Sequence, residues 1–220
     1  MINCLIDAGM ADKLFTNDDL KRVLKGTPAS RYALVNKALK KSHIIQLRRG
    51  AYVMDQKYTH KLFNEFCIAS QMIPHSYVSL ESALSFHGWI PEKVTVVSSV
   101  IHHGRTKTFS TRLGEFHYHF IPVNEYEFLT GVKRVKDQQH PFLMASPLRA
   151  LMDLVYEKKI RWQGLTFLIE SLRIESEYLF QIKKVDFNAM KQVYRSKRLL
   201  TFLQQLEAAI SHHEPFNYTR

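Results

Sequence analysis

The sequence predicts an α+β fold in which a small basic N-terminal unit precedes a larger mixed α/β part with a small sheet and C-terminal helices. Three observations support this prediction. The spacing of apolar residues changes from three or four to two near residue 43. Of the net charge of +11, six units lie in residues 1–50, which hold ten Lys and Arg and four Asp and Glu. The hydrophobic fraction of 45% permits a buried core and excludes wholesale disorder.

Two short helices are expected first. Residues 2–14 carry apolar side chains at helical spacing, and Gly9 is the weak point of that helix. Thr16, followed three residues later by Asp19, forms a capping-box pattern that opens a second helix. Gly26 is placed to end it.

A third helix is expected immediately afterwards. Thr27 supplies an N-cap and Pro28 a first helical residue, so the helix begins there and runs to about Ser42. Its inward face is expected to consist of Leu34, Val35, Ala38 and Leu39.

A β-hairpin follows the third helix. Residues 43–47 and 51–54 have strand-like patterns on either side of a short turn, Arg48-Arg49-Gly50. Three helices followed by a basic-tipped hairpin is the order of a winged helix-turn-helix. The polar stretch 55–58 then separates two expected domains, a DNA-binding domain at 1–55 and an α+β domain at 59–220.

The second domain is expected to mix helices and strands. Ser146 and Pro147 repeat the N-cap and first-residue pattern, and single glycines mark turns. The helices are expected at 60–72, 79–87, 148–156, 165–180 and 187–210, the strands at 95–100, 107–111 and 115–121, and a frayed tail at 212–220.

The third helix and the hairpin tip carry the candidate DNA-binding residues. Side chains at the start of a recognition helix contact base edges, and nearby Lys and Arg hold phosphates. Arg and Asn can also bond guanine and adenine edges bidentately. The candidates are Ser30, Arg31, Asn36, Lys37, Lys40, Lys41, Arg48 and Arg49. The alternative is a solvated basic face on a protein-interaction domain.

A second basic group lies further along the chain, at residues 133–136 and 158–161. If these two stretches meet in space, they extend a DNA-contacting surface. Otherwise their charged side chains are simply solvent-exposed.

Catalytic and metal-binding patterns are weak. His117 and His119 would share one face of a strand, but no Cys or acid is spaced to complete a site, so no metal is expected there or at His102 and His103. The chain has no Gly-x-Ser-x-Gly elbow and no glycine-rich phosphate loop, and Cys67 lies among apolar neighbours. We therefore expect no catalytic residues, no cofactor and no enzymatic activity.

A cytoplasmic location is expected. Two cysteines cannot form a disulfide framework, which fits a reducing compartment. No apolar run approaches the roughly 20 residues that span a bilayer, and the first residues lack a secretory pattern. No membrane partner is expected.

Four ordered blocks resemble a known family. The segment FTNDDLKRVL followed by TPASRYALVNKALKKSHIIQLRRGAYVM resembles the winged-helix domain of AbiEi-type antitoxins of bacterial abortive-infection systems. The blocks YVSLESALSFHGWIPE, VTVVSS with RTKTFSTRLGEFHYHFIP, and ASPLRALMDLVY resemble the second domain of that family in the same order. The resemblance covers roughly residues 15–160.

The resemblance implies a DNA-binding autorepressor that binds inverted repeats in its own promoter. It also implies that the C-terminal domain counteracts a nucleotidyltransferase toxin encoded beside it. Two other hypotheses remain open. One is a stand-alone transcription regulator whose C-terminal domain senses a ligand or oligomerises, and the other is an enzyme whose site lies in that domain.

Overall fold

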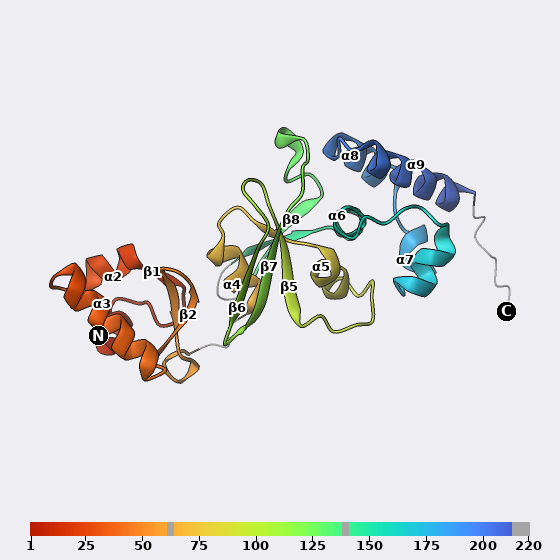
Figure 1. Cartoon of the computed structure of the whole chain (residues 1–220). Coiled ribbons are helices and arrows are strands. Elements are labelled where there is room, and N and C mark those ends of the chain that lie inside the picture. The colour runs from red at the N-terminus through yellow and green to blue at the C-terminus, as the bar shows by residue number, and fades with distance from the viewer. Residues whose placement is uncertain (61–63, 138–140, 213–220) are drawn as a thin grey trace.

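The protein is described by a computed structural model that covers residues 1–60, 64–137 and 141–212. It is a mixed α+β structure with two sheets and a group of C-terminal helices (Figure 1). The α+β class, the sheet and the C-terminal helices are therefore confirmed. Within the described residues, no helix is long and apolar enough to cross a membrane.

The N-terminal part alternates helices with short strands. In chain order its elements are α1 (Ile2–Asp7), β1 (Phe15–Thr16), α2 (Asn17–Val23), α3 (Pro28–Lys40), β2 (Ile44–Arg48), β3 (Ala51–Met54) and the 3-10 turn η1 (Gln56–Tyr58). The strands form an antiparallel sheet in the order β1-β3-β2. The strand β1 was not expected, because two residues are too few to show a period.

The expected helix starts are confirmed by their hydrogen bonds. The side chain of Thr16 accepts a bond from the Asp19 amide, and the Asp19 carboxylate accepts one from the Thr16 amide. The Thr27 hydroxyl accepts a bond from the amide of Ser30. The first helix is shorter than expected, because Gly9 adopts a φ of 67° and the chain turns away.

The inward face of α3 differs from the expected one. Val35 and Ala38 are buried and Leu39 is half-buried, but Leu34 is 38% exposed, so its inward placement was wrong. The hairpin lies beside the side of α3 that carries Leu39, together with Gln46 and Tyr52. The side that carries Leu34 stays open to solvent.

The larger part is built on a second sheet. Its elements are α4 (Glu65–Met72), β4 (Tyr77–Val78), α5 (Leu80–Phe86), β5 (Val96–Ile101), β6 (Lys107–Thr111), β7 (Gly114–Phe120), the 3-10 turn η2 (Glu125–Glu127), β8 (Val132–Val135), β9 (Phe142–Ala145), α6 (Pro147–Glu157), the π-helical turn η3 (Phe167–Ser171), α7 (Ser176–Phe180), α8 (Lys184–Val193) and α9 (Lys197–Ser211). Of the expected segments, residues 61–63 and 213–220 lie outside the described residues.

The six strands of this sheet have the order β6-β7-β5-β4-β9-β8, with parallel pairs β5–β7 and β4–β9. Figure 1 shows α4 on the face of the sheet toward the N-terminal part and α5 and α6 on the opposite face. Side chains of β7 therefore alternate between two environments. The buried Tyr118 donates to the carbonyl of Ala69 in α4, whereas His117 and His119 point to the face covered by α5 and α6.

Two expected long helices are interrupted. The stretch 165–180 breaks between η3 and α7, where Arg173 has a φ of 55°. The stretch 187–210 breaks between α8 and α9, where Tyr194 forms a β-bridge with Val123. The apolar spacing continues through both breaks, so local periodicity alone did not reveal them.

A buried ion pair lies at the centre of the larger part. Arg149 and Asp153, one turn apart on α6, are both fully buried, with Nε 3.3 Å from Oδ1. The Asp153 carboxylate accepts bonds from the hydroxyls of Tyr77 (3.0 Å), Ser79 (2.7 Å) and Tyr194 (2.6 Å). Arg149 donates to the Tyr77 hydroxyl (2.7 Å) and the carbonyl of Thr130 (3.1 Å). We call this the Arg149–Asp153 network.

The two tyrosines of the Arg149–Asp153 network stay protonated. Burial raises the pKa of Tyr77 and the pKa of Tyr194 well above the ordinary tyrosine value. Both hydroxyls therefore keep the protons that they donate to Asp153. A buried carboxylate with three donors and one cation around it meets the requirement that buried charge be paired and hydrogen-bonded.

The N-terminal sheet packs against the larger part. Ile45, Leu47 and Val53 belong to the large core, whereas the other face of the same sheet packs on α1, α2 and α3. Polar contacts also cross the junction, among them the bond from Arg48 Nε to the Met72 carbonyl. The Leu14 amide donates to Gln71, and the Arg112 guanidinium donates to the Ser42 hydroxyl at 2.8 Å. Removal of residues 1–58 would therefore uncover apolar surface on the remaining chain.

Breaking the Arg149–Asp153 network is expected to cost much more stability than breaking an exposed ion pair. Arg149→Met should lower the free energy of unfolding by about 3–5 kcal/mol, because Asp153 loses its buried partner. Tyr194→Phe should lower the free energy of unfolding by about 1–3 kcal/mol, because one oxygen of the buried Asp153 carboxylate loses the hydroxyl that donates to it. Urea unfolding followed by circular dichroism measures both.

The matched control is Arg22→Met, which removes a 2.7 Å ion pair to Asp19 from a side chain that is 74% exposed. This substitution should lower the free energy of unfolding by about 1 kcal/mol or less. Equal costs for Arg149→Met and Arg22→Met would contradict a structural role of the network.

Candidate nucleic-acid interface

The outward face of α3 is exposed and basic. It consists of Ala29, Ser30, Ala33, Lys37 and Lys40, continued by Lys41, all of them exposed. Small side chains occupy its first half and lysines its second half. The Ser30 hydroxyl donates to the Thr27 carbonyl (2.9 Å), which keeps the first turn compact. A partner can therefore approach the helix backbone closely at its start and meet positive charge further along.

Most of the charge around this face is positive. Residues 20–54 contain nine Lys and Arg and no Asp or Glu. These residues comprise most of α2, all of α3 and the hairpin. A surplus of this size favours a polyanionic partner.

A groove separates α3 from the hairpin, and we call it the α3–hairpin groove. It has a volume of about 600 Å³. Arg31, Asn36 and Arg49 line it, together with Asn17 and Asp18 at the start of α2 and Gln46 on β2. Arg31 is half-buried and its guanidinium donates to the Gly26 carbonyl at 2.6 Å, so it also closes the turn between α2 and α3.

Tyr32 is a groove residue that the sequence reasoning missed. It projects from the first half of α3, lines the α3–hairpin groove and is 70% exposed. Tyrosine hydroxyls are among the groups that contact phosphate oxygens in protein–DNA complexes. Its place in the sequence could have identified it as a candidate, because it lies four residues before Asn36 and therefore on the same side of the helix.

The two arginines of the hairpin tip have different surroundings. Arg49 is exposed and lines the α3–hairpin groove. Arg48 is half-buried, and its Nε donates to the carbonyl of Met72 in α4 at 2.8 Å. A register shift between Gln46 and Arg48 accounts for the difference, since this β-bulge turns Arg48 toward the larger part.

The tip itself depends on Gly50. Its φ of 75° belongs to the left-handed region, and a Cβ at this position would lie 3.0 Å from Nδ2 of Asn17. The Gly50 carbonyl also accepts a bond from the Asn17 amide. The tip is therefore held against the first turn of α2, which fixes Arg49 beside the groove.

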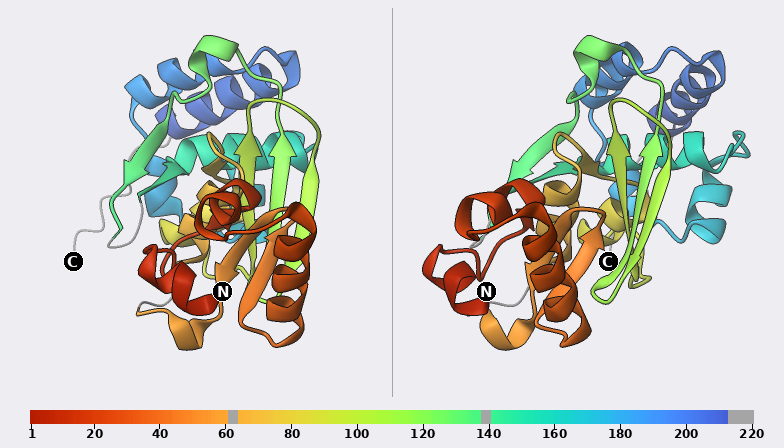
Figure 2. Two further views of the ribbon diagram at one scale, coloured as in Figure 1. Left: turned by 90° about the vertical axis from the view of Figure 1, so that its left-hand side faces the viewer. Right: turned by 60° about the vertical axis from the view of Figure 1, so that its left-hand side comes forward.

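The eight candidate residues thus divide into three groups. Ser30, Lys37, Lys40 and Lys41 share the outward face of α3, and Arg31, Asn36 and Arg49 line the α3–hairpin groove beside it. Arg48 lies at the junction with α4 and is separate from both groups. We call the first two groups together the α3 surface. Figures 1 and 2 show α3 on the side of the molecule away from α8 and α9.

The second basic group does not form one surface. The strand β8, which carries Lys133 and Arg134, pairs with β9 directly before α6, whereas residues 158–161 follow the end of α6. An α-helix of 11 residues separates the two ends by about 16 Å. Lys158 is paired with Glu81 at 3.3 Å. These residues therefore do not extend the α3 surface together.

The histidines of β7 line a cleft of about 690 Å³ between the sheet and α6, the α6 cleft. Nδ1 of His119 lies 3.2 Å from a Glu157 oxygen, but without the geometry of a hydrogen bond, and His119 is only 9% exposed. His117 lies 3.6 Å from Glu115. An acid is thus near each histidine. Glu115, two residues before His117 on the same strand, could be placed from sequence spacing, whereas Glu157 on α6 could not.

No protein-family model matches the chain, and no curated protein matches it. We therefore infer the function from the geometry of the α3 surface and the chemistry of its residues.

Arg48→Met and Arg49→Met are expected to separate the two roles at the hairpin tip. Arg48→Met should lower the free energy of unfolding by about 1.5 kcal/mol or more, because a charged donor to the Met72 carbonyl is lost. Arg49→Met should change it by less than about 0.5 kcal/mol, as is usual for an exposed side chain. Denaturant unfolding of the full chain measures the change in the free energy of unfolding for both variants. Equal changes would contradict the different surroundings of Arg48 and Arg49.

Proposed function

We propose that the protein binds double-stranded DNA through α3 and the tip of the β2–β3 hairpin, and that the N-terminal part acts as a winged helix-turn-helix. The order α1-β1-α2-α3-β2-β3 and the antiparallel sheet fit that fold. The observation that carries the proposal is the outward face of α3, which is exposed, free of acids and basic in its second half.

Each group of residues has a role in this proposal. The small side chains Ala29, Ser30 and Ala33 let α3 enter the major groove, and Asn36 and Arg31 supply groups that can bond base edges. Lys37, Lys40 and Lys41 neutralise phosphates, which gives affinity without sequence information. Arg49 on the hairpin side of the α3–hairpin groove and Tyr32 on its α3 side contact the adjacent DNA backbone.

We further propose that the protein is a transcriptional autorepressor and antitoxin that counteracts a nucleotidyltransferase-like toxin. The support is the ordered resemblance of four sequence blocks to AbiEi-type antitoxins. Two of these blocks, residues 77–92 and 145–156, contribute Tyr77, Ser79, Arg149 and Asp153 to the Arg149–Asp153 network. In this proposal the activity is binding and not catalysis, and the operator is an inverted repeat in the protein's own promoter.

A second candidate function is a stand-alone regulator that senses a small ligand. The observation that favours it is the α6 cleft, whose wall combines apolar side chains with the nearly buried His119 and with Glu157. Mixed walls of this kind are typical of small-molecule sites. In this alternative, ligand binding to the larger part modulates DNA binding, and no toxin is involved.

Charge reversal on α3 is expected to weaken DNA binding. Lys37→Glu with Lys40→Glu should reduce the affinity for a duplex of the promoter region by more than tenfold at 0.1 M salt, because two phosphate contacts become repulsive. Lys37→Ala with Lys40→Ala should make the fall of log association constant with log salt concentration less steep by about two. Fluorescence anisotropy with a labelled duplex measures both quantities.

The control is Lys184→Glu with Lys197→Glu, which makes the same change in net charge at exposed positions of α8 and α9. It should alter the affinity far less, because these helices lie away from α3 (Figure 2). Equal losses in the two variants would mean that binding follows net charge and not the α3 surface.

Co-expression with the product of the neighbouring gene is expected to separate antitoxin from regulator. The full-length Lys37→Glu, Lys40→Glu variant should still restore growth if the larger part counteracts the toxin independently of repression. The full chain is required, because the hairpin covers part of the large core. If only DNA-binding-competent protein restores growth, protection works through repression, and the stand-alone regulator becomes the better account.

A further inference from the structure

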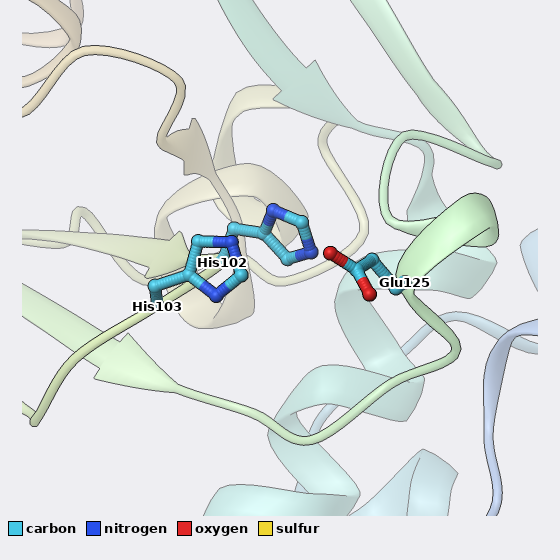
Figure 3. Close-up of side chains that lie close together, drawn as sticks. All are labelled: His102, His103 and Glu125. Atoms are coloured by element: carbon cyan, nitrogen blue, oxygen red, sulfur yellow. The ribbon is translucent and has the colours of Figure 1, made fainter.

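Three metal-ligating side chains meet at one end of the six-stranded sheet. His102 and His103 directly follow β5, and Glu125 begins η2, 22 residues later. One ligand atom from each of the three lies within 4.8 Å of the others. Figure 3 shows the His102 ring between the His103 ring and the Glu125 carboxylate. We call this group the His–Glu cluster.

The core of the larger part positions both segments of the cluster. His102 follows Ile101, which pairs with Phe120 in the sheet, and its ring stacks on the buried Phe128 at 4.5 Å. On the other side, the amide of Asn124 donates to the Val193 carbonyl at 2.8 Å. Val123 bridges Tyr194, a member of the Arg149–Asp153 network. The ligand groups are therefore held near one another before any ion binds.

The ligand atoms of the cluster are available. Across residues 1–60, 64–137 and 141–212, no side-chain hydrogen bond or ion pair occupies His102, His103 or Glu125. The nearby Glu127 differs, since its carboxylate accepts a bond from the Thr130 hydroxyl. His102 is half-buried, and His103 and Glu125 are exposed, so an ion can enter from solvent.

The chemistry of the donors selects the class of ion. Two imidazoles and one carboxylate suit Zn²⁺, and three protein ligands leave a fourth position for water. Imidazole favours Zn²⁺, Cu²⁺ and Ni²⁺ over Mg²⁺, which prefers oxygen ligands. The two rings have centroids 3.8 Å apart, and one nitrogen of each lies within 4.8 Å of a Glu125 carboxylate oxygen.

We propose that His102, His103 and Glu125 bind one divalent transition-metal ion, with Zn²⁺ the best-fitting ion, and leave one coordination position open to water. The ion links the loop after β5 to η2 and, through Val123 and Asn124, to the segment that joins α8 and α9. This site is separate from the α3 surface, so the proposal does not depend on DNA binding.

Zn²⁺ titration of the metal-free full-length protein tests the proposal. Isothermal titration calorimetry should show one Zn²⁺ bound per chain, and binding should raise the melting temperature. His103→Ala and Glu125→Gln should each weaken Zn²⁺ binding by more than tenfold, since each removes one of three ligands. Mg²⁺ at the same concentration should produce no melting shift.

The matched control is His117→Ala, which removes a histidine from β7 and leaves the His–Glu cluster intact. It should bind Zn²⁺ as the unmodified protein does. Circular dichroism establishes that the variants remain folded. The proposal is overturned if the His102→Ala, His103→Ala double variant binds Zn²⁺ as tightly as the unmodified protein, if the unmodified protein binds none, or if His117→Ala loses binding equally.

Discussion

The fully buried ion pair between Arg149 and Asp153 constrains the arrangement of the larger part of the chain. Two charges in the interior are tolerated only when they are paired and their remaining hydrogen-bonding capacity is satisfied. The partners come from four places in the chain: Tyr77 on β4, Ser79 at the start of α5, Thr130 before β8 and Tyr194 between α8 and α9. The sheet, α6 and the C-terminal helices must therefore meet at one point.

This constraint extends to the surface that we propose for DNA binding. The sheet fixed by the Arg149–Asp153 network, together with α4, forms the platform on which the hairpin packs through Ile45, Leu47 and Val53. Arg48 adds a bond to α4, while the bulge leaves Arg49 at the groove. The orientation of α3 relative to the larger part is thus set by packing. Coupling between the larger part and the proposed DNA-binding surface would have to pass through this junction.

Local chemistry explains what could be predicted from the sequence. The helix starts at Thr16, Thr27 and Ser146 were predictable because caps depend on neighbouring residues, and the exposed lysines of α3 followed from its period. What was missed depends on distant contacts. Leu34 is exposed because the hairpin lies on the other side of α3, the breaks near Arg173 and Tyr194 interrupt continuous apolar patterns, and Glu125 reaches His102 through the fold. None of these has a signature within a short window.

The central claim is that α3 and the hairpin tip form the DNA contact surface of the intact protein. Amide chemical-shift mapping by nuclear magnetic resonance, with the full-length protein and a promoter duplex, tests it most directly. The account predicts that the largest shifts fall in residues 28–41 and at Arg49 and Gly50, with little change around the α6 cleft. Shifts centred on residues 133–136 or 158–161, or no shifts at saturating duplex, would contradict it.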